Sequence, residues 1–143
     1  MTTSAQPTIL QRSVEQARHW IDETAAELGH DDKRAAYRAL KAVLHTLRDR
    51  STVEESAQLA SQLPELIRGA FYENWTPART PERYRDAAAF LDRVRDHAGL
   101  AGETEASFAV SAVMTVLRRH VSTGELDDVL ATMPSPVREL LET

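Results

Sequence analysis

The chain has 143 residues, of which 42% are hydrophobic, and a formal net charge of −5. This composition is typical of a globular protein, and the acidic balance makes binding to nucleic-acid phosphates unlikely on electrostatic grounds. The absence of cysteine excludes disulfides, thiolate zinc sites and cysteine nucleophiles. We expect a cytoplasmic location and no contact with membranes, because the sequence lacks a signal-like start and any run of about 18 apolar residues.

Apolar residues recur at spacings of three and four, which predicts an all-α protein of about eight helices. The first helix is expected over residues 8–28, ended by Gly29. Its inward stripe is predicted to contain Leu10, Val14, Ala17, Ile21 and Leu28, with Trp20 beside it. Further helices are expected over residues 32–50, 53–63 and 64–75. Thr52 and Glu55 match a capping box at the start of the third helix.

Residues 76–81 contain two prolines and form the one obvious linker, which we expect to be extended and stiff. Thr80 is predicted to cap the next helix and Pro81 to open it. The helices of the second half are expected over about residues 81–98, 103–120, 122–133 and 136–141. The helix over 103–120 is the most apolar, with Phe108 among its apolar residues, so we expect it to be central.

An internal repeat emerges when the chain is shifted by about 70 residues, so that residues 11–71 lie over 81–141 without a gap. The matches fall on helix caps, helix ends and inward stripes, and include Arg48 on Arg118, Thr52 on Ser122, Pro64 on Pro134 and Arg68 on Arg138. We expect two tandem sub-repeats, 8–75 and 80–143, packed as one helical bundle in a single domain, 1–143. The alternative is two independent units joined by the linker.

The segments 47–55 and 62–77, with Phe90 and Leu91, 116–119 and 124–129 in the second half, resemble a bacterial family called domain of unknown function 2267. The resemblance covers nearly the whole chain from Leu10 onward. It implies a small, intracellular, all-α bacterial protein. It implies no activity and no catalytic residues, because the family has no established biochemical role to transfer.

No pattern in the sequence indicates catalysis or cofactor binding. A Gly-x-Ser-x-Gly elbow and a glycine-rich phosphate loop are both missing. Glu27 and His30 have the Glu-x-x-His spacing of di-iron bundles, but that site needs two such motifs and two more carboxylates. We therefore expect no catalytic, cofactor or metal residues. The histidines, at 19, 30, 45, 97 and 120, are expected at the surface or at helix ends.

Two groups of residues form the candidate interaction surface. The first is a basic stripe on one face of the second helix, made of Arg34, Arg38, Lys41, His45 and Arg48. It is either a docking face for an acidic partner or phosphate, or a solvated face opposite the core.

The second group is Arg68, Tyr72 and Trp75, which recur at helical spacing. Arg, Tyr and Trp dominate the energetics of protein interfaces, although the two aromatic residues could instead pack the linker onto the bundle. Arg68 is repeated by Arg138, and we expect it to pair with Glu55, as Arg138 would with Glu125.

These observations favour a non-enzymatic protein-interaction or adaptor module with a protein partner, and homo-oligomerisation is compatible with the sequence. The alternatives are a helical protein that binds a metal or a small ligand, and a protein that binds an anionic partner through the basic stripe.

Overall fold

The computed structural model describes residues 8–143, so residues 1–7 of the predicted domain 1–143 lie outside the described residues. The described chain forms eight α-helices, one short 3-10 turn and no strand, which confirms the all-α prediction. The elements are α1 (Thr8–Leu28), α2 (Lys33–Arg50), α3 (Val53–Ser61), α4 (Glu65–Tyr72), η1 (Pro77–Arg79), α5 (Ala87–Ala98), α6 (Glu103–His120), α7 (Thr123–Ala131) and α8 (Ser135–Glu142).

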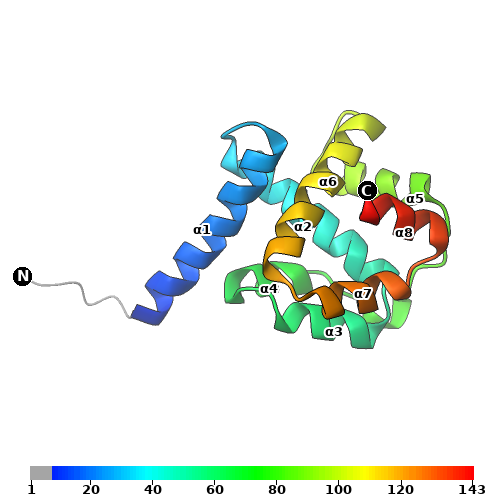
Figure 1. Ribbon diagram of the computed structural model, residues 1–143, viewed down its shortest axis with the longest axis horizontal. Helices are drawn as coiled ribbons and strands as arrows, with labels where there is room; N and C mark the ends of the chain where they lie inside the picture. The colour runs from blue at the N-terminus through cyan, green and yellow to red at the C-terminus, as the bar shows by residue number, and fades with distance from the viewer. Residues whose placement is uncertain (1–7) are drawn as a thin grey trace, which may run out of the picture.

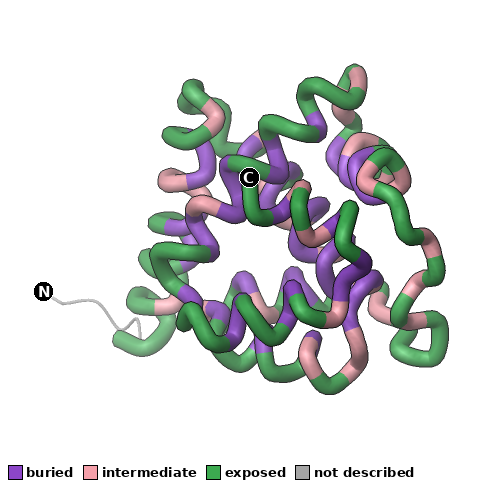
Figure 2. The backbone as a smooth tube through the Cα atoms, turned by 45° about the vertical axis from the view of Figure 1, so that its right-hand side comes forward, coloured by how far each residue is buried: buried purple, intermediate pink, exposed green. Residues whose placement is uncertain are grey.

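α2 and α6 lie in the middle of the molecule, and the other helices pack around them (Figure 1). α1 lies at one side, and its N-terminal half projects away from the other helices (Figure 1). The buried parts of the backbone face inward along the helices of both halves (Figure 2). The predicted central position of the helix over 103–120 is therefore correct, and α2 shares that position.

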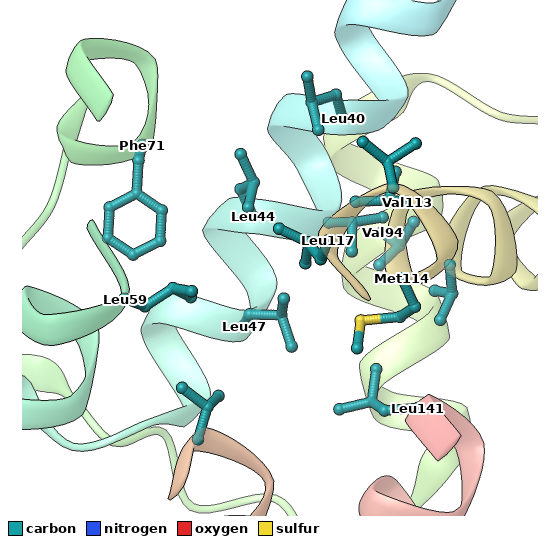
Figure 3. Close-up of a cluster of buried hydrophobic side chains, with 14 of the residues drawn as sticks. Leu40, Leu44, Leu47, Leu59, Phe71, Val94, Val113, Met114, Leu117 and Leu141 are labelled. Carbon is teal, nitrogen blue, oxygen red and sulfur yellow. The ribbon is translucent and has the colours of Figure 1, made fainter. Parts of the chain in front are cut away.

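The core is one continuous cluster of buried apolar side chains drawn from both halves of the chain. Leu44 and Leu47 of α2 lie between Phe71 of α4 on one side and Val94 and Val113 of the second half on the other (Figure 3). All these side chains except Leu44 and Leu47 are 0% exposed, and those two are 1% exposed. Burial of each such side chain is worth about 1.5–3 kcal/mol, so the two halves stabilise each other.

Several contacts join or resemble one another across the two halves of the chain. α1 packs on α6 as α5 packs on α2, and α3 packs directly on α7. The hydroxyl of Thr52 caps α3, and the hydroxyl of Ser122 caps α7. Arg48 donates to the carbonyl of Phe71, and Arg118 donates to the carbonyl of Leu141 in the corresponding place.

The prediction that Thr80 and Pro81 begin a helix is wrong. α5 begins at Ala87, where the carboxylate of Asp86 accepts a hydrogen bond from the Ala89 N–H at 2.8 Å. A β-region residue with an Asp side chain is a strong N-cap. The segment before α5 is not helical and is bound to the end of α2, where the Glu82 N–H donates to the Asp49 carbonyl at 2.7 Å.

The linker and the end of the fourth helix also differ from their predictions. Pro77–Arg79 form a 3-10 turn, so residues 76–81 do not make an extended spacer. α4 ends at Tyr72 because Glu73 has a ψ of 131°, outside the helical region, and Asn74 then adopts a positive φ of 59°. Trp75 therefore lies beyond the helix.

None of the described helices is by itself long and apolar enough to cross a membrane; α5 and α6 meet that criterion only when joined across a bend of 89°.

Candidate functional site

The apolar stripe of α1 continues beyond the part of the helix that is buried. Ala17 and Trp20, in the second half of α1, are buried in the common core. In the first half, Ile9, Leu10 and Val14 are 66%, 54% and 44% exposed. The prediction that Leu10 and Val14 face inward is therefore wrong, because the helix extends past the surface against which its stripe packs.

A groove of about 860 Å³ runs between α1 and the start of α4. Ile9 and Trp20 contribute to its wall on α1, and Pro64 and Arg68 contribute on the opposite side. Both helices that border the groove carry exposed apolar side chains, since Leu66 of α4 is 49% exposed and Tyr72 is 37% exposed. Charged residues at its rim include Arg12, Glu15 and Glu65.

Arg68 lines this groove, but its guanidinium group is bound within the chain. Its Nε donates to the carbonyl of Ala60 at 2.9 Å, and its Nη2 donates to the carbonyl of Leu63 at 2.9 Å. Arg138 makes the corresponding contacts with carbonyl groups at the end of α7. The predicted pairing of Arg68 with Glu55 is wrong, because the arginine instead satisfies carbonyls that the end of α3 leaves without a helical partner.

Tyr72 and Trp75 lie next to each other, with ring centroids 5.3 Å apart. Tyr72 also contacts the ring of Phe71, so it joins the exposed surface of α4 to the core. Trp75 is half-buried, and its Nε1 is buried without a hydrogen-bond partner among the described residues. Arg68 and Tyr72 thus lie on the same surface of α4, whereas Trp75 packs against the C-terminal end of this helix.

Three residues of the predicted basic stripe hold α4 in place. Lys41 pairs with the carboxylate of Glu73 at 3.1 Å. His45 donates to the carbonyl of Ala70 at 2.7 Å, and burial lowers the pKa of His45, which favours its neutral form. Arg48 is 3% exposed and donates to the carbonyls of Phe71 and Glu73.

Only the far end of the stripe faces solvent, where Arg34 and Arg38 are exposed. Since Lys41 is paired, His45 is favoured as neutral and Arg48 is buried, the exposed positive charge of the stripe is much smaller than the sequence suggests. A spacing of three and four shows that side chains share a helix face, but does not show what covers that face.

Two histidines that the sequence separates by about a hundred positions meet at one carboxylate. His19 lies one turn from Glu23 on α1, and His120 is the last residue of α6. Both Nε2 atoms face Glu23 Oε2, at 2.9 Å and 2.6 Å. Burial alone would raise the pKa of Glu23, but hydrogen bonds from His120 and Arg119 outweigh it, and the net pKa is lowered.

Sequence reasoning missed this cluster. The i,i+4 spacing of His19 and Glu23 was visible and is a usual metal-ligand spacing on a helix, whereas the position of His120 depends on the packing of α1 on α6. Glu27 and His30, which were considered for a metal site, have separate partners. Glu27 pairs with Arg119, and His30 accepts a hydrogen bond from the backbone of Asp32.

Two glutamates face each other where α3 packs on α7. Glu125 is 7% exposed, and neither its Oε2 nor that of Glu55 has a hydrogen-bond partner among the described residues. Burial, together with the nearby charges of Glu55 and Asp128, raises the pKa of Glu125 to about 7. The shift follows from the position of Glu125, because a carboxylate that is buried beside another carboxylate ionises less readily.

The fold and these sites describe a small helical protein with an open groove. The uncharacterized conserved protein family DUF2267 matches residues 17–140. The chain belongs to this family, as its resemblance predicted, and the match covers both halves. No curated protein matches the chain in a separate comparison.

Proposed function

We propose that the protein is a non-enzymatic interaction module that binds an amphipathic helix of a partner protein along the groove between α1 and α4. The observation that carries this proposal is the exposed half of the α1 stripe. The stripe has the spacing of a buried helix face, yet Leu10 and Val14 are 54% and 44% exposed, and Ile9 next to them is 66% exposed.

The distribution of exposed apolar residues supports this location. Among the described residues, six large apolar side chains are exposed, namely Ile9, Leu10, Val14, Leu66, Tyr72 and Phe108. Every one except Phe108 lies on α1 or α4, the two helices that border the groove. Of the six, Ile9 lines the groove itself, so a partner in the groove must extend over the neighbouring surface of α1 to bury Leu10 and Val14. Complete burial of one such side chain contributes about 1.5–3 kcal/mol.

A helix is the occupant that best fits an elongated groove between two helices. Amphipathic helices bind in such grooves through apolar anchors at spacings of three, four and seven, with polar residues around the rim. Arg12, Glu15 and Glu65 supply charges of both signs at this rim. Tyr72 and Arg68 are of the residue types that carry much of the energy of interfaces.

The test is affinity capture from the cytoplasm of the source cells with the wild-type chain and with Ile9→Glu/Leu10→Glu, which changes one apolar residue that lines the groove and one exposed residue beside it. Both side chains are exposed, so the double variant should remain folded, which circular dichroism checks. Phe108→Glu is the matched control, because Phe108 is 67% exposed but lies on α6. A partner retained by Phe108→Glu and lost by the α1 variant supports the proposal. Equal loss with both variants contradicts it.

We further infer that the two halves are copies of one four-helix unit, with sub-repeats 8–75 and 80–143. The inference rests on the paired caps Thr52 and Ser122 and on the paired carbonyl contacts of Arg68 and Arg138. α1 differs most from its counterpart, since it is longer than α5 by nine residues (21 against 12). The additional residues of α1 include the exposed part of the stripe. The proposed binding surface therefore lies on a part of α1 that has no counterpart in α5.

The module is proposed to act in the cytoplasm, with a protein as its partner. Docking of an anionic partner on the basic stripe is the weaker alternative, because Arg34 and Arg38 are its only exposed members. Nucleic acid is a poorer candidate still, given the net charge of −5.

A further inference from the structure

Three side chains of metal-binding type converge where α1 packs on α6. His19 Nε2 and His120 Nε2 lie 2.9 Å and 2.6 Å from the same atom, Glu23 Oε2. The three donor atoms all lie within 4.8 Å of one another. Two imidazole nitrogens and one carboxylate oxygen form a donor set that zinc uses when a solvent molecule completes its coordination.

We propose that His19, Glu23 and His120 bind one Zn²⁺ ion, which joins the N-terminal helix to the second half of the chain. This site is proposed to bind a metal ion, whereas the groove is proposed to bind a partner helix. His19 and His120 nevertheless also line that groove.

The surroundings of Glu23 suit a bound cation. Arg119 donates from Nη1 to Glu23 Oε1 at 2.9 Å, which leaves Oε2 directed at the histidines. Such an outer hydrogen bond fixes the orientation of a ligating carboxylate. Arg119 also pairs with Glu27, so the two carboxylates outnumber the one guanidinium group and the local charge is negative. The ring of His120 stacks on Trp20, with centroids 5.0 Å apart, which restricts its rotation.

The donor atoms need to separate only slightly to hold the ion. Bonds of about 2.0–2.1 Å in a tetrahedral arrangement place ligand atoms about 3.3 Å from one another. The observed distances to Glu23 Oε2 are 2.9 Å and 2.6 Å. The side chain of His19 is 67% exposed, so rotation of this side chain opens the site without disturbing the core.

The donor set also determines which ions are expected. Imidazole ligands suit zinc and its neighbours such as cobalt, whereas magnesium and calcium prefer sites made of oxygen atoms alone. Zn²⁺ is therefore the proposed ligand, Co²⁺ is a spectroscopic substitute, and Mg²⁺ serves as the negative control.

The experiment is isothermal titration of the untagged full chain, freed of metal with a chelator, with Zn²⁺ and separately with Mg²⁺. We expect one Zn²⁺ per chain and no saturable heat with Mg²⁺. His19→Ala should weaken Zn²⁺ binding at least about tenfold, because even outer-sphere changes at zinc sites cost about 10- to 100-fold. Glu23→Gln should weaken it as well, and His97→Ala, on exposed α5 surface, should leave it unchanged.

His19→Ala carries the decisive comparison, because the exposure of His19 makes loss of folding an unlikely cause of lost binding. A second readout is thermal unfolding, in which Zn²⁺ should raise the Tm of the wild-type chain and of His97→Ala but not of His19→Ala. Absence of saturable Zn²⁺ binding, or equal affinity of wild type and His19→Ala, would overturn the proposal and leave the cluster as a set of contacts that joins α1 to α6.

Discussion

The buried pair of Glu55 and Glu125 makes the stability of the protein depend on pH in a predictable direction. Glu125 is 7% exposed, and its pKa is raised to about 7 from an ordinary value of 4.5. An acid whose pKa is raised by folding binds more protons in the folded state than in the unfolded state between those two values. The free energy of unfolding therefore falls as the pH rises from about 4.5 to 7, and this contribution is constant above and below that window.

The perturbation is Glu125→Gln, which keeps the shape of the side chain and removes its charge. One pKa unit corresponds to about 1.4 kcal/mol, so the difference between 4.5 and about 7 sets an upper limit of about 3 kcal/mol on the effect. The Gln side chain can in addition donate a hydrogen bond to Glu55. At pH 8 the variant should be more stable than the wild type by about 1–3 kcal/mol, and at pH 4.5 the two should be nearly equal.

Urea denaturation followed by circular dichroism at the two pH values measures both free energies. Glu54→Gln is the matched control, because Glu54 is adjacent in sequence to Glu55 but exposed, so it removes the same charge from a position outside the buried pair. The reasoning is refuted if the difference between wild type and Glu125→Gln is the same at pH 4.5 and pH 8.

Two further predictions concern the carbonyl contacts of Arg68 and Arg138 and two glycines in different backbone conformations. Arg68→Ala and Arg138→Ala should each lower the free energy of unfolding by about 1–3 kcal/mol, because each leaves buried carbonyls unpaired; urea denaturation measures this, and a loss below about 0.5 kcal/mol would contradict it. Gly99→Ala should lower the free energy of unfolding by about 1 kcal/mol, because Gly99 has a φ of 68°. Gly124→Ala should raise it by up to about 1 kcal/mol, because Gly124 lies inside α7 and has open space at its Cβ position. Changes in the free energy of unfolding that have the same sign in both glycine variants would contradict this prediction.

Hydrophobic periodicity and capping residues predicted the eight helices of the described chain and most of their bounds. α1 and α6 match their predicted ranges, and Thr52 and Ser122 cap α3 and α7 as the capping-box pattern indicated. The prediction failed at the start of α5, because Thr80 and Asp86 are both plausible caps. The choice between them depends on a hydrogen bond from Glu82 to the distant Asp49 carbonyl, which no local pattern contains.

The candidate site was harder to predict, because burial of a helix face depends on its neighbours. Arg48 and Arg34 share one face of α2, yet Arg48 is buried under α4 and Arg34 is exposed. Leu10 and Ala17 share one face of α1, yet only Ala17 reaches the core. The convergence of His19 with His120 likewise requires the packing of α1 on α6, which joins opposite ends of the chain.

The central claim is that the exposed part of α1 contacts a partner protein, and photo-cross-linking in living cells tests it most directly. A photoreactive amino acid replaces Leu10 in one chain and Phe108 in a second, since both positions are exposed but lie on different helices. We predict a discrete adduct with another polypeptide from position 10 and none from position 108. Adducts with a second copy of this chain would make that copy the partner, whereas no adduct from position 10, or the same adducts from both positions, would contradict the claim.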